Sequence, residues 1–163
     1  MSKAFTSEEA TLEVVVPPRA PLPPGVSNYV TARGLELLRA ERRELEGARA
    51  ALADGPEEGR GAALAAWSQR LAELEQRLAS AELVEPGSAR QGVVRFGSKV
   101  TVADASGQEK TYEIVGVDEA DPAAGRVAFL SPLAKALLGH EVGDSVRVQT
   151  PGKAQELEIS AIE

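Results

Sequence analysis

The stretch Asp54-Gly-Pro-Glu-Glu-Gly-Arg-Gly61 decides the fold, because it separates two segments of helical periodicity. Gly55 and Pro56 should end the first helix, and Gly59 with Gly61 allows the chain to reverse direction. Two apolar seams of similar length joined by so short a segment predict an antiparallel helical hairpin. We expect this coiled-coil hairpin to span residues 28–85.

Apolar residues recur at helical spacing on both sides of the reversal. The first segment begins at Thr31, which is placed as an N-cap, and has leucines at steps of three and seven: Leu35, Leu38, Leu45 and Leu52. The second segment alternates steps of three and four: Leu64, Trp67, Leu71, Leu74, Leu78 and Ala81. This spacing is typical of a coiled-coil seam, and we expect Trp67 to belong to it.

The first 27 residues form a proline-rich segment. Its prolines are Pro17, Pro18, Pro21, Pro23 and Pro24. Proline at this density prevents both helix and sheet hydrogen bonding, so an extended or disordered tail is expected. A proline motif that binds a partner is the alternative.

After Pro86 and Gly87 the periodicity changes from helical to strand-like, which predicts a domain boundary and a second domain over residues 86–163. Strands are expected within residues 93–103, 112–117, 126–130, 145–149 and 157–162. Ser131 and Pro132 should begin a short helix over residues 133–138, closed by Gly139. The fold class is α+β: a helical hairpin followed by a small antiparallel sheet with one short helix.

Composition excludes several functional classes. The net charge of −7 and the pI near 4.9 argue against coating nucleic acid by bulk electrostatics. The absence of cysteine excludes disulfides and thiolate metal sites, and the single histidine, His140, is expected on the surface. No apolar run approaches 18 residues, so we expect a soluble, cytoplasmic protein without a membrane partner.

Six short motifs occur in a characteristic order. They are Asn28-Tyr-Val-Thr31 with Gly34, Phe96-Gly-Ser98, Tyr112-Glu-Ile-Val-Gly116, Asp118-Glu-Ala-Asp-Pro122, Ser131-Pro-Leu-Ala-Lys-Ala-Leu-Leu-Gly139 and Val142-Gly-Asp144. In this order and spacing the sequence resembles the Gre transcript-cleavage factors, and most closely their GreB branch.

The resemblance implies an FKBP-like C-terminal domain that docks on the rim of the RNA polymerase secondary channel, with the coiled coil projecting toward the active site. The implied docking residues are Asp118, Glu119, Asp121, Pro122, Ser131 and Pro132. Asp121 and Pro122 are the strongest candidates among them. The alternative is that Asp121-Pro122 only initiates a turn, which its chemistry also favours.

Catalytic residues are expected at the hairpin tip. Active family members carry Asp-x-Ser-Glu-Asn-Ala there, and the two acids help to hold a second Mg²⁺ ion in the polymerase active site. Asp54 and Glu57 keep the spacing of these acids, although the remaining motif is lost. Two hypotheses stay open: Asp54 and Glu57 are catalytic ligands of a Mg²⁺ ion shared with the polymerase, or they belong to an acidic solvated turn.

The hairpin arms also look shorter than those of GreB, by about two turns each, which at about 5.4 Å per turn withdraws the tip by roughly 10 Å. Basic residues along the arms, Arg33, Arg39 and Arg43 with Arg70 and Arg77, form a patch facing RNA or polymerase if the resemblance holds. The alternative is the ordinary charge pattern of a soluble coiled coil.

The leading functional hypothesis is a monomeric elongation factor whose partners are RNA polymerase and the 3′ end of the nascent RNA. It would bind no cofactor alone and would be an accessory factor, because the polymerase active site catalyses any RNA cleavage. Within this hypothesis the protein either stimulates cleavage or occupies the channel without it. A prolyl isomerase is a distant alternative, because Phe96, Tyr112 and Phe129 cannot easily form the aromatic pocket that such enzymes use. A plain coiled-coil adaptor would not need the loop at residues 118–122.

Overall fold

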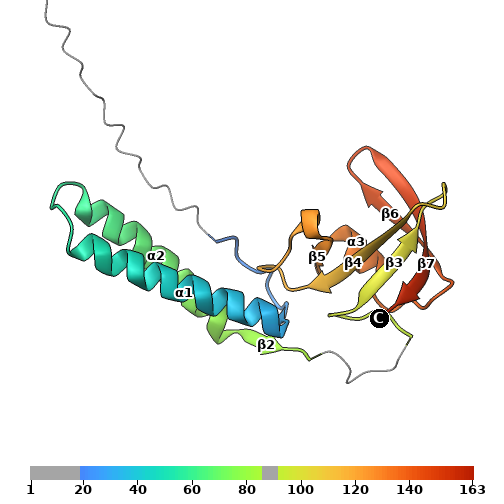
Figure 1. The fold of residues 1–163 in the computed structure, drawn as a ribbon, viewed down its shortest axis with the longest axis horizontal. Helices are drawn as coiled ribbons and strands as arrows, with labels where there is room; N and C mark the ends of the chain where they lie inside the picture. Colours follow the sequence, from blue (N-terminus) through green and yellow to red (C-terminus); the bar gives the residue numbers. More distant parts are fainter. Residues whose placement is uncertain (1–18, 86–91) are drawn as a thin grey trace, which may run out of the picture. The chain divides into compact units, whose positions relative to one another are not determined.

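A computed structural model describes residues 19–85 and 92–163, and it confirms the α+β fold class (Figure 1). These residues divide into two compact units. One unit contains Arg39–Ala79 and the described residues before Pro23, and the other contains Pro23–Leu38 and Ser80–Glu163. The expected boundary at Pro86 and Gly87 lies outside the described residues, as do the first 18 residues of the expected tail.

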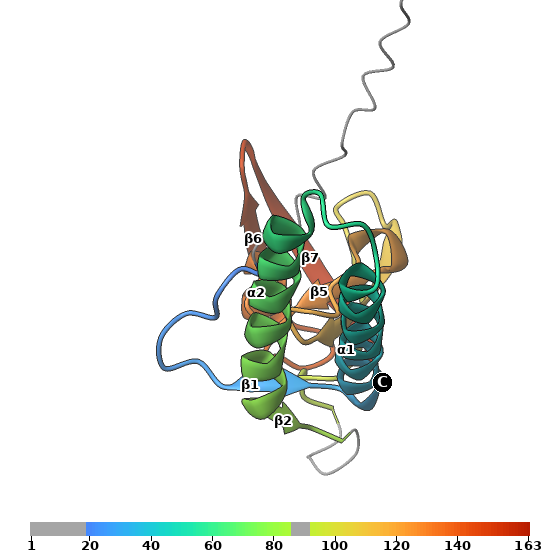
Figure 2. The same ribbon diagram turned by 90° about the vertical axis from the view of Figure 1, so that its left-hand side faces the viewer.

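The first unit contains most of the helical hairpin, whose first helix begins in the second unit. Helix α1 (Ala32–Ala53) and helix α2 (Arg60–Ala79) lie side by side in both views (Figures 1 and 2). Leu45, Leu71 and Leu74 are buried, which confirms the apolar seams, and Trp67 is half-buried. Ala81 was wrongly placed in the second seam, because α2 ends at Ala79. No helix among the described residues is long and apolar enough to cross a membrane.

The side chain of Arg60 stabilises the turn between the two helices. Arg60 Nη1 donates hydrogen bonds to the carbonyl oxygens of Ala53, at 3.2 Å, and of Gly55, at 2.9 Å. Ala53 is the last residue of α1 and Gly55 follows it closely, and at this end a helix leaves its carbonyl acceptors without internal partners. Gly59 has a φ of +71°, which a residue with a side chain rarely adopts. The breaker segment therefore reverses the chain as its composition predicts.

The second unit begins with a short pairing that the sequence did not reveal. Strand β1 (Asn28–Val30) pairs in parallel with β2 (Ala81–Leu83). Asn28 is buried, and its side-chain amide donates to Ser80 Oγ at 3.2 Å. The segment that precedes α1 is thus hydrogen-bonded to the segment that follows α2.

The main sheet has five strands in the order β5-β4-β3-β7-β6. Their bounds are β3 Lys99–Ala103, β4 Glu109–Val115, β5 Arg126–Ala128, β6 Ser145–Thr150 and β7 Lys153–Ile162. All neighbouring pairs are antiparallel except β4 and β5, which are parallel. The expected antiparallel sheet is therefore modified at one edge, because the chain after β4 loops back before it enters β5.

Two other sequence expectations need adjustment in this sheet. Strand β7 begins at Lys153 instead of residue 157, because β6 and β7 are hydrogen-bonded to each other directly from the turn that joins them. The expected strand at residues 93–103 begins only at Lys99, and Val93 makes a single isolated bridge with Glu141.

A short helix, α3 (Pro132–Leu137), follows β5 as predicted. Ser131 Oγ accepts a hydrogen bond from the backbone N–H of Ala134 at 3.2 Å, so Ser131 is its N-cap. The core of this unit is mainly aliphatic, in a chain of which only 4% is aromatic. Its most deeply buried residues are Leu38, Val94, Val100, Val102, Ile114, Val115, Ala134, Leu137 and Ile159.

Glycine at position 116 is required by packing, which leads to a prediction. A Cβ on Gly116 would lie 2.7 Å from the carbonyl oxygen of Tyr29, whereas a Cβ on Gly47 in α1 would meet nothing within 4 Å. Gly116→Ala should therefore lower the free energy of unfolding by about 1–3 kcal/mol. Gly47→Ala should raise it by about 0.5–1 kcal/mol, because alanine favours the helix. Urea unfolding followed by circular dichroism checks both values, and equal effects of the two substitutions would contradict the close approach.

Candidate functional site

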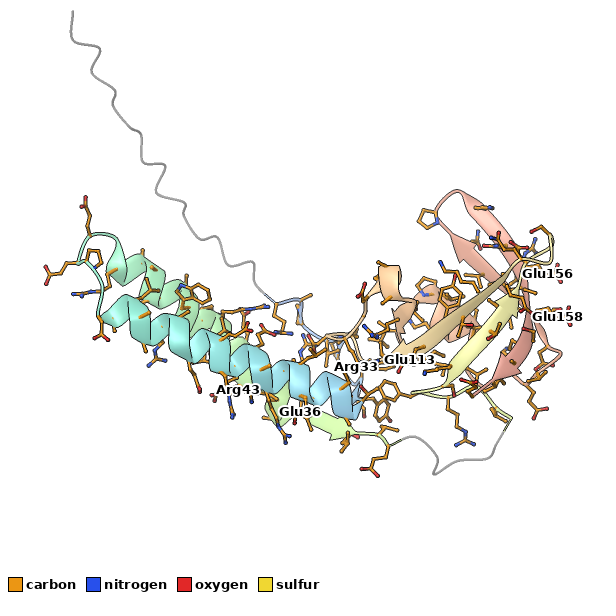
Figure 3. All side chains as sticks on the ribbon, viewed as in Figure 1. Arg33, Glu36, Arg43, Glu113, Glu156 and Glu158 are labelled. Carbon is orange, nitrogen blue, oxygen red and sulfur yellow. The ribbon has the colours of Figure 1, made fainter. Side chains whose placement is uncertain are left out.

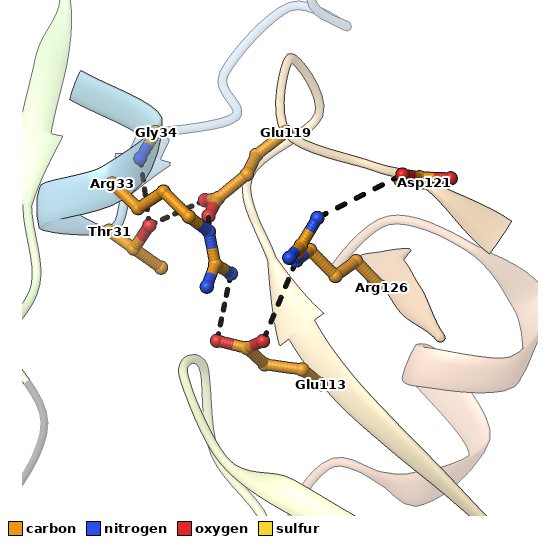
Figure 4. A network of polar contacts seen from close by, with 7 residues as sticks. All are labelled: Thr31, Arg33, Gly34, Glu113, Glu119, Asp121 and Arg126. Atoms are coloured by element: carbon orange, nitrogen blue, oxygen red, sulfur yellow. Dashed lines mark hydrogen bonds and ion pairs between the residues drawn. The ribbon is translucent and has the colours of Figure 1, made fainter. Parts of the chain in front are cut away.

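A chain of alternating charges links the start of α1 to the loop between β4 and β5 (Figure 4). All of its members belong to the second unit. In order they are Thr31, Glu119, Arg33, Glu113, Arg126 and Asp121. Acid and base alternate after Thr31, so each charged group faces a group of opposite charge.

Glu119 is the buried centre of this network. Its side chain is only 1% exposed, and it accepts hydrogen bonds from Thr31 Oγ1 and from Arg33 Nε, both at 2.5 Å. Thr31 Oγ1 also accepts from the backbone N–H of Gly34 at 3.0 Å, which confirms Thr31 as the N-cap of α1. The first turn of α1 contains no acidic residue of its own. Glu119 therefore supplies the negative charge that the N-terminus of a helix favours.

Gly34 leaves the space that this carboxylate occupies. A Cβ on Gly34 would lie 2.7 Å from Glu119 Oε2 and 3.4 Å from Thr31 Oγ1. Neither atom is free to move away, because the two are hydrogen-bonded to each other. Glycine at this position is thus a condition for the contact between α1 and the loop.

Arg33 joins two carboxylates across the network. Its Nε contacts Glu119, and its Nη2 contacts Glu113 Oε1 at 3.0 Å, as Figure 4 shows. Burial alone would lower the pKa of Arg33, but the hydrogen bonds and negative charges of Glu113 and Glu119 outweigh it, and the pKa is raised. Arg33 is therefore held firmly in its charged form.

The loop after β4 closes on itself. The backbone N–H of Asp121 donates to the carbonyl of Arg126 at 3.0 Å, and the N–H of Arg126 donates to the carbonyl of Asp121 at 2.9 Å. A short 3-10 helix, η1 (Pro122–Ala124), lies between them. Gly125 has a φ of +74°, and a Cβ there would lie 2.9 Å from the carbonyl oxygen of Thr111. The loop is thus a tightly bonded turn at the edge of the sheet.

The side chains at the tip of this turn face outward. Asp121 is 50% exposed and lies 3.8 Å from Arg126 Nη1, and Pro122 is exposed. Arg126 Nε in turn lies 3.8 Å from Glu113 Oε2. The arrangement presents an acid and a proline on a loop that is closed by the two backbone hydrogen bonds between Asp121 and Arg126.

Comparison with known proteins identifies the family. Transcription elongation factor GreA of Alkalilimnicola ehrlichii is 41% identical to the chain over 147 residues, which cover 80% of this chain and 93% of that protein. The chain belongs to the GreA/GreB family. The family model described as transcription elongation factor, GreA/GreB, C-term, matches residues 89–163.

Other relatives match over different shares of their length. GreA of Beijerinckia indica is 47% identical over 91 residues, and this chain spans 58% of its length. The solved structure of GreA factor homolog 1 of Thermus thermophilus is 27% identical and covers 85% of this chain and 99% of its own, with a TM-score of 0.41, too low for structural inference. The curated relatives are named GreA, so the expected closeness to the GreB branch is not confirmed.

The expected docking residues of this GreA/GreB chain differ in their surroundings. Asp118 is half-buried, and the Glu119 side chain is almost completely enclosed, so a partner cannot reach the Glu119 carboxylate in this arrangement. Ser131 caps α3, and Pro132 is the first residue of that helix. Asp121 and Pro122 are the expected docking residues that lie exposed on the closed loop.

At the hairpin tip, Asp54 and Glu57 are both exposed. The Glu57 side chain is 92% exposed, and its carboxylate lies 3.7 Å from Arg60 Nη2. Within residues 19–85 and 92–163, no group of three Asp, Glu, His or Cys side chains could hold a metal ion.

The remaining candidates are placed as follows. Arg39 and Arg43 are exposed on α1, and Arg43 projects from the helix in Figure 3. Arg33, another member of the expected patch, is engaged by two carboxylates. His140 is exposed as expected and lies 3.3 Å from Asp144.

The aromatic residues pack together. The rings of Tyr29, Phe96 and Phe129 have centroids 5.6–5.8 Å apart in all three pairs. Tyr112 is absent from this cluster, and Lys110 Nζ lies 5.1 Å from its ring centroid. The mutual packing of these rings gives no support to a prolyl isomerase pocket.

Sequence reasoning did not identify Glu113 and Arg126. They are opposite each other in the parallel register of β4 and β5, and both serve the network. That these two residues lie close together can be recognised only once the parallel pairing of β4 and β5 is known. Glu119 was found through its motif, but its contact with Thr31 spans 88 residues and leaves no local signal.

The burial of Glu119 generates a testable prediction. Glu119→Gln keeps the shape of the side chain but removes the charge that Arg33 and the N-terminus of α1 require, and its amide presents donors to the donor Arg33. We expect the free energy of unfolding to fall by about 1–2 kcal/mol, since Arg33 is partly solvated. Urea unfolding measures this loss.

Glu156→Gln is the matched control, because Glu156 is exposed on β7 and should change stability by less than about 0.5 kcal/mol. Equal unfolding midpoints for the two variants would show that the Glu119 contact does not stabilise the fold.

Proposed function

We propose that this chain is a transcription elongation factor that binds RNA polymerase at the secondary channel and modulates paused or backtracked complexes. Membership of the GreA/GreB family carries the proposal, together with relatives that are named transcription elongation factors. The proposal holds for either branch of the family.

Polymerase docking is assigned to the loop at residues 118–122. Asp121 and Pro122 are exposed, while the backbone of the loop is fixed by hydrogen bonds between Asp121 and Arg126. A loop ordered before binding loses little conformational entropy when a partner binds, so its exposed groups can contribute more to affinity. Glu119 acts in this proposal as a positioning residue, because its carboxylate is buried against Thr31 and Arg33. Ser131 and Pro132 act similarly, through the start of α3.

The length of the hairpin determines how far the tip can reach. Helix α1 has 22 residues and is therefore about 33 Å long at about 1.5 Å per residue. The alignment with GreA of Alkalilimnicola ehrlichii spans 147 positions, but 80% of 163 residues fills only about 130 of them, so about 17 lack a counterpart in this chain. A deficit of this size fits two arms that are each shortened by about two turns.

In this proposal the chemistry of RNA cleavage belongs to the polymerase. Asp54 and Glu57 would contribute carboxylate ligands to a Mg²⁺ ion of the polymerase active site, and that ion would supply the activation of water for RNA cleavage. Metal ligands must lie near 2 Å from the ion, so side-chain rotation cannot compensate for a tip withdrawn by roughly 10 Å. Occupancy of the channel with weak cleavage is therefore the favoured mechanism.

The docking assignment predicts the effect of one double substitution. In the full-length chain, Asp121→Lys with Pro122→Gly reverses the exposed charge and loosens the loop, so affinity for core polymerase should fall at least about tenfold. Fluorescence titration of labelled protein with core polymerase measures the change.

The control is Glu156→Lys with Pro151→Gly, which makes the same chemical changes at exposed positions elsewhere in the second unit. Thermal melting must show that both variants remain folded. If the two variants bind polymerase equally well, the loop at residues 118–122 is not the docking element.

The short hairpin predicts a separation of binding from cleavage. With a backtracked elongation complex, the protein should compete measurably with an active Gre factor, while cleavage of the RNA should be weak or absent. Competition reports docking, and cleavage reports whether the tip brings carboxylates to the metal ion. Efficient cleavage that disappears in Asp54→Ala with Glu57→Ala, while competition persists, would show that the hairpin reaches deeper than its length implies.

A further inference from the structure

The segment directly before the hairpin contacts both of its helices. Arg19 lies in the same compact unit as Arg39–Ala79, and its side chain is only 10% exposed. Its guanidinium contacts Glu41 on α1 at 2.5 Å, and its backbone N–H donates to Glu73 on α2 at 2.9 Å. Arg77 of α2 donates to the carbonyl oxygen of Ala20. Two consecutive residues are thus held at three points.

The two helices provide two carboxylates and one guanidinium group for these three contacts. Glu41 is oriented by Arg70, at 3.0 Å, and Glu73 by Gln69, at 2.9 Å. The hydrogen bond from the Arg19 N–H, followed by that from Gln69, lowers the pKa of Glu73, so its carboxylate stays ionised at neutral pH. Arg77 is 7% exposed despite its charge. A buried arginine needs acceptors, and the Ala20 carbonyl is one of them.

We propose that the hairpin carries a binding site for an extended, arginine-containing peptide segment, and that residues 19–22 of the same chain occupy it as a strap across α1 and α2. This inference concerns a different surface from the polymerase-docking loop and does not depend on the proposed function.

The chemistry of the site defines its ligand. One carboxylate accepts a backbone N–H, a second accepts a guanidinium, and an arginine donates to the next carbonyl, so the ligand must be an extended chain with arginine at the first position. Pro21 follows directly and has no N–H that would need an acceptor. Its fixed φ also restricts the unbound segment, which lowers the entropy lost on binding. Pro21 is thus suited to its place in this contact.

The strap changes the interpretation of two arginines on the hairpin. The sequence made Arg70 and Arg77 candidates for a basic patch facing RNA or polymerase. Arg70 is committed to Glu41, and Arg77 is covered by the strap. While the strap is bound, this face of the hairpin is closed to other ligands.

Proteolysis tests the strap directly, because trypsin cleaves after arginine and needs an extended, accessible chain. In the full-length protein, cleavage between Arg19 and Ala20 should be slow. It should accelerate at least about tenfold in Glu41→Ala with Glu73→Ala, and also in Arg77→Met, since each change removes part of the site while Arg19 remains. Mass spectrometry of the released N-terminal fragment gives the rate, and circular dichroism establishes that the helices persist.

Glu44→Ala with Glu75→Ala is the matched control, because both residues are exposed on the same two helices. This variant should be cleaved at the wild-type rate. Rapid cleavage of the wild type, or equal rates in the site and control variants, would overturn the proposal. Protection that disappears on dilution would show that the segment binds a second copy instead of its own chain.

Discussion

The buried carboxylate of Glu119 is the contact on which the arrangement of the second unit depends. It accepts a hydrogen bond from the hydroxyl of Thr31, which caps α1, and it pairs with the charge of Arg33. It also places negative charge at the start of the helix. Burying a carboxylate costs free energy unless it is paired with a cation and accepts hydrogen bonds. The residues around Glu119 must therefore provide a positive charge and hydrogen-bond donors. The glycine at position 34 follows from the same requirement, because any larger residue would occupy the space of the carboxylate.

This contact also connects the charged side chains of the loop between β4 and β5 to the start of α1. From Arg33 the alternating charges continue through Glu113 and Arg126 to Asp121. The exposed groups of the loop and the first turn of α1 are therefore parts of one bonded network within the second unit. The strap plays a comparable part in the first unit, where it joins α1 and α2 through carboxylates and Arg77. In both units polar contacts between distant parts of the sequence supplement an aliphatic core with few aromatic residues.

Local features of the fold were readable from the sequence. The hairpin helices, the reversal at Gly59, the N-caps Thr31 and Ser131 and the short helix α3 all follow from patterns confined to a few consecutive residues. Features that depend on distant pairing were not readable: the parallel pairing of β1 with β2 is only three residues long, and the parallel edge of the sheet depends on the path of a loop. The same limit applies to the candidate site. Asp121 and Pro122 stood out through their motif, but the burial of Glu119 and the attachment of Arg19 arise from partners 22 to 88 residues away.

The central claim is that this GreA/GreB chain engages polymerase through the loop at residues 118–122 while the hairpin tip enters the secondary channel. Site-specific photo-crosslinking in the complex of the full-length chain with core polymerase tests it most directly. A photoreactive amino acid at position 124, beside the loop, or at position 58, at the tip, should crosslink to polymerase, with position 58 reaching residues inside the channel. The same amino acid at the exposed position 156 should not crosslink. Crosslinks from position 156 alone, or from position 58 only to the outer surface of polymerase, would contradict the account.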